Sequence, residues 1–207
     1  MQLTYFTIAS MTTIPHTNQP ILQPPGKGLP LYELLVARLL VWWRYNRTSR
    51  QEAAATFKLE REEILRLSRE LDQTAAARPI LIKRLRGLED SSRFWSVYMT
   101  VDHLRIVNTE VATIIQDLIL GVRPQHIATT KGVKPSTSAD AATLNDFEHA
   151  CNRFEEITNN AQDLRTNMTW KHPWFGELDA QQWHFFAGFH MHLHRRQILA
   201  IREILCR

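Results

Sequence analysis

Histidine is the residue type whose spacing in this chain most clearly indicates chemistry, because an imidazole can bind a metal ion or carry a proton near neutral pH. The chain has nine histidines. His190 and His194 lie four residues apart in a stretch whose apolar residues recur at helical spacing. On a helix, that spacing places both imidazoles on one face, one turn apart, where they can share a metal ion. Gln197 falls on the same face and is expected to line the pocket rather than bind the ion, whereas His192 lies about 160° away and is expected to point outward.

A third ligand must come from another helix, and His103 is the candidate. The apolar residues that flank it at helical spacing are Trp95, Met99, Ile106, Val107 and Ile114. Three inward-facing histidines from two helices leave a coordination position open, as in catalytic rather than structural metal sites. Neutral imidazoles suit zinc, nickel, iron or manganese, so these three ligands do not determine which divalent metal is bound. The alternative is a metal-free core in which hydrogen bonds satisfy the histidines, since an unpartnered buried polar group costs about 1–3 kcal/mol.

The other histidines are interpreted as lying away from such a site. His184 falls off the apolar stripe of its helix. We expect His16, His126, His149 and His172 at the surface, because they lie in the N-terminal leader, in loops or on polar helix faces. Glu110, on the same face as His103, is interpreted as a partly exposed structural carboxylate. The alternative is that it supports one of the metal-binding histidines without contacting the ion. Cys151 is expected to be a buried small apolar residue.

Long helices are needed to position these side chains. They are expected over residues 31–45, 53–71, 91–120, 143–164 and 180–205. Capping boxes that begin at Ser49, Thr143 and Asp179 mark helix starts. Before Ser49 the pattern fits either a break near residues 46–49 or one long kinked helix. No convincing strand appears. The pattern predicts an all-α fold, an up-down four-helix bundle with an extra apolar helix on its N-terminal side.

The helical stripes also give a predicted core and a predicted domain boundary. The core residues are expected to be Phe57, Ile64, Leu67, Trp95, Ile106, Ile114, Phe147, Phe154, Phe186 and Ile201. Prolines and glycines make residues 1–30 an extended leader, which leaves residues 31–207 as a single bundle domain. The helix Leu31–Tyr45 is apolar nearly all round and must be buried, on the bundle or across a homodimer. Trp42 and Trp43 make this helix the candidate interface.

Composition and charge exclude several classes of protein. The 207 residues are 44% hydrophobic, enough for a substantial core and unlike a disordered or collagen-like chain. The net charge is +4, but basic and acidic residues alternate along the helical stretches, which favours a solvated surface over nucleic-acid binding. No apolar run is long enough to span a bilayer, so no membrane partner is expected. Two cysteines make no disulfide framework and suit the cytoplasm.

Three parts of the sequence together carry a family resemblance. They are His103 in mid-helix, the run His190-x-x-x-His194-x-x-Gln197, and His172-Pro-Trp-Phe-Gly176 leading into the last helix. This pattern resembles the DinB-like family, whose name comes from DNA-damage-inducible bacterial proteins. The resemblance covers about residues 50–205 and does not include the apolar helix Leu31–Tyr45.

The resemblance implies a four-helix bundle that holds a divalent metal ion with three histidines, here His103, His190 and His194. It also implies homodimers, and thiol-dependent transferase or isomerase chemistry with a low-molecular-weight thiol and a small-molecule substrate. The expected function is therefore a divalent-metal-dependent enzyme, a thiol-dependent transferase or a hydrolase. The alternative is a non-catalytic helical bundle that acts through dimerisation or partner binding.

Overall fold

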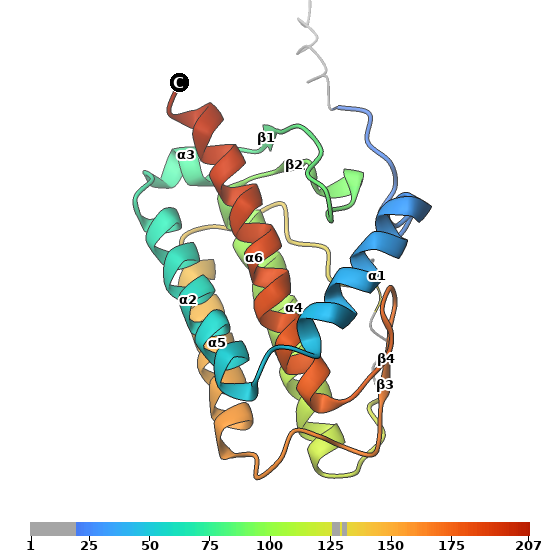
Figure 1. Ribbon diagram of the computed structural model, residues 1–207. Helices are drawn as coiled ribbons and strands as arrows, with labels where there is room; N and C mark the ends of the chain where they lie inside the picture. Colours follow the sequence, from blue (N-terminus) through green and yellow to red (C-terminus); the bar gives the residue numbers. More distant parts are fainter. Residues whose placement is uncertain (1–19, 126–128, 130–131) are drawn as a thin grey trace, which may run out of the picture.

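Four long helices dominate the computed structural model, which describes residues 20–125, 129 and 132–207 (Figure 1). They are α2 (Arg50–Arg69), α4 (Val97–Ile119), α5 (Ala142–Asn160) and α6 (Ala180–Leu205). α4 packs against α5 and α6, and α2 packs against α6. The chain therefore forms a mostly helical structure around a four-helix bundle, as the sequence predicts.

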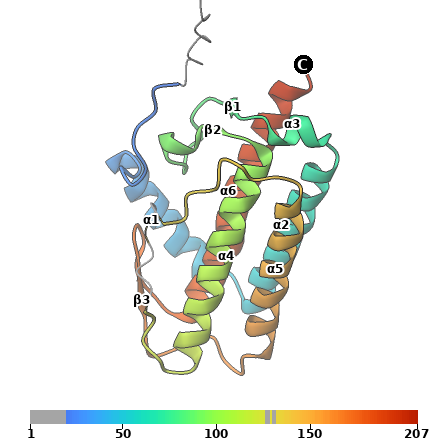
Figure 2. The same cartoon turned by 180° about the vertical axis from the view of Figure 1, so that it is seen from behind.

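The directions of the helices differ from the simple up-down order that the sequence pattern predicts. α2 and α6 run one way and α4 and α5 the other, which the colour gradient shows from both sides (Figures 1 and 2). Glu60 contacts His192, and Leu67 farther along α2 contacts Arg202 farther along α6, so these two helices are parallel. α5 begins at the end of the bundle where α4 also begins, so the connection between them has to span the length of the bundle (Figures 1 and 2). It can do so because roughly twenty extended residues reach ~66 Å, well beyond the ~35 Å length of α4.

Two small antiparallel sheets join the long helices, so the expectation of no strands is wrong. β1 (Ile80–Leu81) pairs with β2 (Phe94–Trp95), and β3 (Trp170–His172) pairs with β4 (Gly176–Leu178). A short helix α3 (Gln73–Ala77) precedes β1, and the 3-10 helix η1 (Asp90–Ser92) precedes β2. The strands have two or three residues each, which is too few for an alternating pattern to be recognised in the sequence.

Two of the predicted helix starts are confirmed by reciprocal capping bonds. The Ser49 hydroxyl accepts from the Glu52 amide while the Glu52 carboxylate accepts from the Ser49 amide, and Asp179 with Gln182 does the same at the start of α6. The first of these boxes also settles the alternative left open by the sequence. The chain breaks there, and α2 begins as a separate helix.

Two other helix starts differ from the prediction. α4 begins after β2 rather than directly after residue 90, and Ser96 caps it by accepting from the Met99 amide at 3.0 Å. α5 has no side-chain bond at its N-cap, so the capping box expected at Thr143 and Asp146 is wrong. The later start of α4 leaves room for β2, which carries Trp95 to the site described below.

The core lies between the four long helices. Of the core residues predicted above, Ile106 is the one that is only partly buried. Phe57 stacks on Phe154 with ring centroids 4.1 Å apart, which ties α2 to α5. Gly188 lets α6 approach α2 closely, since a Cβ at that position would lie 3.3 Å from the Phe57 backbone nitrogen.

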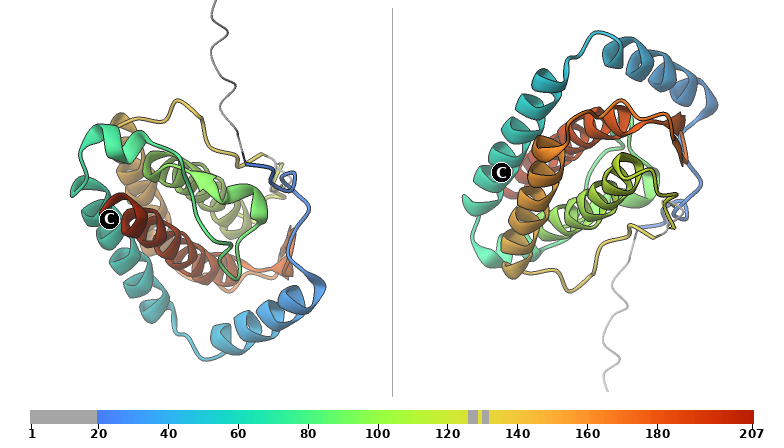
Figure 3. Two further views of the ribbon diagram at one scale, coloured as in Figure 1. Left: turned by 90° about the horizontal axis from the view of Figure 1, so that it is seen from above. Right: turned by 90° about the horizontal axis from the view of Figure 1, so that it is seen from below.

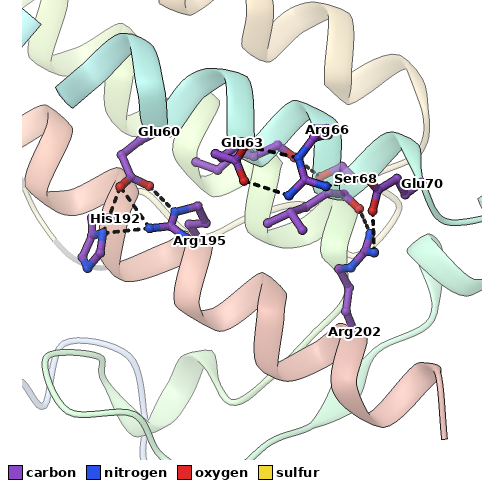
Figure 4. Close-up of polar contacts among 10 residues, drawn as sticks. Glu60, Glu63, Arg66, Ser68, Glu70, His192, Arg195 and Arg202 are labelled. Carbon is purple, nitrogen blue, oxygen red and sulfur yellow. Dashed lines mark hydrogen bonds and ion pairs between the residues drawn. The ribbon is translucent and has the colours of Figure 1, made fainter. Parts of the chain in front are cut away.

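Ion pairs add a polar connection between α2 and α6 (Figure 4). Glu60 is buried and accepts from Arg195 Nε at 2.5 Å and from His192 Nδ1 at 2.9 Å. Farther along, Arg202 binds the Glu70 carboxylate at 2.7 Å. A buried carboxylate with two cationic or hydrogen-bonding partners fixes the rotation of α6 about its axis. That rotation decides which residues of α6 face α4.

The first helix, α1 (Leu31–Tyr45), lies outside the four-helix bundle (Figures 1 and 3). Polar bonds attach it: Glu33 accepts from Arg84 Nη2 and from the Gly87 amide, both at 2.5 Å, and Arg38 donates to the Trp174 carbonyl at 2.6 Å. Glu33 is its one buried residue. Burial raises the Glu33 pKa, but the bonds from Arg84 and Gly87 outweigh it and hold that pKa below 4.5.

Apart from Leu34, Ala37, Val41 and Tyr45, which are partly buried, the apolar side chains of α1 remain exposed in the single chain. The large ones are Leu31, Tyr32, Leu35, Val36, Leu39, Leu40, Trp42 and Trp43. The expectation that they are buried on the bundle is wrong, because the four long helices already close the core. Burial across a homodimer stays a prediction. No helix in the described part of the chain is both long and apolar enough to span a bilayer.

The predicted leader, residues 1–30, lies mostly outside the described residues. Residues 20–30 contain no helix or strand. They are attached to the bundle, since Glu89 accepts from the amides of Gly26 and Gly28 and Asp90 accepts from the Gln23 amide. Leu29 is buried. This segment therefore packs as part of the structure and, as shown next, contributes to the site.

Candidate metal centre

Three histidines converge between α4 and α6. The ring centroid of His103 lies 5.1 Å from that of His190 and 4.5 Å from that of His194, and the last two are 4.5 Å apart. One nitrogen from each ring can be chosen so that all three lie within 4.8 Å of one another. The structure thus brings together the three residues that helical spacing and the family resemblance select.

Two of these imidazoles are held by hydrogen bonds at their Nδ1 atoms. His103 Nδ1 lies 2.6 Å from the Val133 carbonyl, and His194 Nδ1 lies 2.8 Å from Gln197 Oε1. An oxygen acceptor requires the proton on Nδ1, which leaves the Nε2 lone pair of each ring directed to the cluster. Metal-binding histidines usually have such an oxygen partner on the nitrogen that does not bind the metal.

Gln197 has a different place from the one predicted. It was expected to line the pocket, but it is fully buried behind His194. Its Oε1 accepts from His194, while its Nε2 donates to the Ser92 carbonyl at 2.7 Å. The amide therefore cannot rotate freely, and it fixes the orientation of the His194 ring. Helical spacing correctly placed Gln197 on the histidine face but could not show the depth of its side chain.

His190 completes the cluster and differs from the other two. Its Nε2 lies 3.3 Å from Nε2 of His103. Within the described part of the chain, no group forms a hydrogen bond with its buried Nδ1. Burial, followed by the nearby His194 and His103, lowers the His190 pKa well below 6.5. The ring is therefore neutral near pH 7, and its proton can occupy either nitrogen.

Burial keeps the whole cluster uncharged. It lowers the His103 pKa to about 4, and burial together with His103 lowers the His194 pKa well below 6.5. Trp95 covers one side, with its ring centroid 5.2 Å from His103 and 6.1 Å from His194. Three neutral imidazoles in such surroundings present lone pairs, which is the form that binds divalent metals.

The histidines face a cavity of about 150 Å³. All three line it, together with side chains of α4, of α6, of the loop before β4 and of the segment around Leu29. Glu110 also lines the cavity and is partly buried, as predicted for a structural carboxylate. A metal ion at the cluster would therefore border a space that a small molecule can occupy.

His172 contradicts the prediction that it lies at the surface. It is 8% exposed and lines the same cavity. The amides of Trp174 and Phe175 donate to its Nδ1 at 3.0 and 3.3 Å, and burial lowers its pKa to about 3. Its place at the end of β3 was not recognised, because this sheet gives so little signal. The aromatic residues that follow His172 in the sequence were the available indication that this histidine is buried.

The remaining histidines lie away from the cluster. His184, predicted to be off the stripe, is buried against Phe154 and borders a separate cavity between α2, α5 and α6. His192 points away as expected and binds Glu60. His149 is exposed, as predicted. The predictions for His16 and His126 fall outside the described residues.

Cys151 agrees with its predicted role. It is fully buried in α5, and burial raises its pKa to about 12. Asn108 Nδ2 lies 3.5 Å from its sulfur. A thiol held in the protonated form is a poor nucleophile and a poor metal ligand. Cys151 therefore packs as a small apolar residue and takes no part in the cluster.

Comparison with known proteins supports the architecture of the chain. No protein-family model and no curated protein matches it. Among solved structures, it is similar to TT2238, a four-helix bundle protein, with a TM-score of 0.55 and 22% sequence identity. The similarity covers 73% of this chain and 99% of the other. At this level of identity the comparison shows a shared four-helix-bundle fold.

Proposed function

We propose that the chain is a divalent-metal-dependent enzyme of the DinB-like type, in which His103, His190 and His194 hold one ion. The observation that carries the proposal is the convergence of three neutral imidazoles at the edge of a cavity. Zinc, nickel, iron and manganese all suit imidazole ligands. The ion would supply Lewis-acid polarisation of a substrate and would favour the deprotonated form of a thiol or water beside it.

The donor set fits such an ion. His103 and His194 are oriented by Val133 and Gln197, so their lone pairs cannot turn away from the cluster. Three protein ligands leave a position open toward the cavity, as in catalytic sites. The reaction class comes from the family resemblance: a thiol-dependent transferase or a hydrolase, with a low-molecular-weight thiol as one substrate. Free Cys151 and Cys206 suit a reducing cytoplasmic location.

A metal-free arrangement is the direct alternative at the same residues. The 3.3 Å contact can be a hydrogen bond in which His190 Nε2–H donates to His103 Nε2. That tautomer leaves the buried Nδ1 of His190 as an acceptor without a donor among the described residues. The cost of such an atom is about 1–3 kcal/mol. The other tautomer leaves the same Nδ1 as a donor without an acceptor among the described residues and also directs two lone pairs at each other. A cation between the two Nε2 atoms would relieve the second of these effects.

Metal analysis of the purified full chain tests the proposal. We expect one divalent ion per chain after dialysis against zinc, nickel, iron(II) or manganese, measured by mass spectrometry and by calorimetry. His190→Ala should abolish binding. His192→Ala is the matched control, because it removes an imidazole on the same helix that points away from the cluster. Absence of stoichiometric metal, or equal binding by His190→Ala and the unmodified chain, would contradict the proposal.

The exposed face of α1 favours a second candidate function, in which the bundle acts through a homodimer. Eight large apolar side chains in one helix are more than a monomer usually leaves in water. Light scattering after size exclusion should then show a dimer. Leu35→Glu with Leu39→Glu should convert it to a monomer, whereas Leu59→Glu, on an exposed position of α2, should not. A monomeric unmodified chain would exclude this function.

A further inference from the structure

The cavity beside the three histidines is lined mainly by apolar side chains. α4 contributes Val107, Val111 and Ile114, and α6 contributes Phe186, Phe189 and Leu193. Trp95 and Trp174 add two indole rings, and Leu29 and Ala37 add aliphatic surface from the N-terminal segment. The histidines are thus the polar end of a space whose other walls offer dispersion contacts and few hydrogen bonds.

Charged side chains at the cavity are few, and none of them is a buried cation. Among the described lining residues, Lys134 is the single cation, and it is exposed. The acids are Glu89 and Glu110, both partly buried, and Glu89 already accepts from the amides of Gly26 and Gly28. A ligand with an anionic group would therefore find one strong partner here, the metal ion. A second charge would be buried without a partner, which is costly.

We propose that the site takes a ligand with one metal-binding head group and an uncharged apolar or aromatic body; this inference rests on the metal site proposed above. The body is about the size of a benzene ring or a short alkyl chain, since an apolar cavity of about 150 Å³ holds benzene. Phosphorylated compounds, sugars and dicarboxylates are disfavoured, because their additional polar groups would lose water and find few partners on these walls.

The apolar wall near Leu193 is the part of the cavity that can be changed with least damage to the core. Leu193 is only partly buried, and its side chain lies against Gly87, where a Cβ would be 3.3 Å from its Cδ2. Leu193 directly precedes His194 on α6, but its side chain lines the cavity and is not part of the bundle core. Leu199, on the same helix, is 40% exposed and does not line the cavity, so it is the matched control position.

Three hydroxamic acids with the same head group test the inference on the zinc-loaded full chain. They are acetohydroxamic acid, hexanohydroxamic acid and adipic acid monohydroxamate, which has a carboxylate in place of the terminal methyl. Hexanohydroxamic acid has four methylenes more than acetohydroxamic acid. Each methylene moved out of water strengthens binding about fourfold, so burying three of the four gives about 60-fold. We expect calorimetry to show hexanohydroxamate binding about 60-fold more tightly than acetohydroxamate, and the adipic compound no more tightly than acetohydroxamate. Similar affinities for the two six-carbon compounds would overturn the inference.

Two variants locate the apolar body. Leu193→Asp should weaken hexanohydroxamate binding at least tenfold and leave acetohydroxamate binding unchanged, while Leu199→Asp should change neither. Circular dichroism and zinc content verify that each variant is folded and loaded. Equal losses for both compounds in Leu193→Asp would show that this residue supports the ion rather than the ligand body, and would overturn the inference.

A chain that binds no zinc would refute the proposed function without deciding the nature of the cavity. Hexan-1-ol, which has the alkyl chain and no chelating group, then serves as the probe on metal-free protein. Saturable changes in tryptophan fluorescence that are lost in Leu193→Asp would support an apolar ligand body, because Trp95 and Trp174 line the cavity. No saturable binding of hexan-1-ol would overturn it.

Discussion

Mild acid should destabilise the metal-free protein strongly, because burial lowers the pKa of five of its histidines. These are His103, His172, His184, His190 and His194. An unfolded imidazole has a pKa near 6.5, so the unfolded chain binds protons before the native chain does as the pH falls. Above pH 6.5 these rings are mostly neutral in both states and do not lower the free energy of unfolding. Below that value the free energy of unfolding falls progressively, down to the native pKa values of about 4 for His103 and about 3 for His172.

The size of the effect follows from the number of buried rings. A pH of 5.5 is one unit below the pKa of an unfolded imidazole. Protonation of the unfolded chain then lowers the free energy of unfolding by about 1.4 kcal/mol per ring relative to pH 7.5. Five independent rings together give up to about 7 kcal/mol, which is comparable with the whole stability of a domain. Carboxylates such as Glu33, whose pKa is held below 4.5, contribute only at lower pH.

Urea titrations in the presence of a chelator, followed by circular dichroism at pH 7.5, 6.5 and 5.5, measure this loss. His184→Leu should reduce the difference by about one fifth, since it removes one of five rings. His149→Ala removes an exposed imidazole and is the control. A total loss below about 2 kcal/mol between pH 7.5 and 5.5 would refute the reasoning, because it would mean that the native chain protonates these rings at little cost.

Four further results are expected. Gln197→Ala should weaken metal binding about 10–100-fold in calorimetry, because His194 Nδ1 loses its acceptor; unchanged affinity would contradict the orienting role. Deleting residues 1–46 should abolish dimer formation or cause aggregation, and a truncated chain with the same oligomeric state and melting temperature would show that α1 is not an interface. Glu60→Ala should lower the free energy of unfolding by roughly 3 kcal/mol, because two α6 side chains lose a buried carboxylate. Glu33→Gln should speed hydrogen exchange of the α1 amides and leave the exchange of α4 unchanged, since the loss is confined to the tether.

The parts of this molecule that were predicted from the sequence are those set by local geometry. Two histidines one turn apart on an apolar stripe must share a face, and His103 among apolar neighbours must also face inward. Capping boxes at Ser49 and Asp179 are local hydrogen-bond patterns, so they could be recognised without tertiary structure. The candidate site was therefore found from periodicity, with the family resemblance selecting the same residues.

The parts that were not predicted depend on long-range packing. The direction of α5 relative to α4 could not be inferred, because a long connection permits either direction. The burial of His172 depends on a three-residue strand pair that gives almost no sequence pattern. The exposure of α1 could not be inferred from its composition, since an apolar helix is expected to be buried and the polar tethers of Glu33 and Arg38 join segments far apart in the sequence.

The separation of the histidines along the chain has a consequence for how the site is made in a cell. His103 and His190 are 87 residues apart. At ~5–20 residues per second, a ribosome needs roughly 4–17 s to reach the second after the first. During that time His103 has neither ring beside it, and α4 and α2 lack the helix that covers both of them. A nascent chain that ends before α6 therefore lacks the proposed metal site, and the apolar surface of α2 and α4 that α6 later covers is still exposed. Metal binding at the proposed site would have to follow synthesis of α6, because the arrival of this helix both closes the core and brings His190 and His194 beside His103.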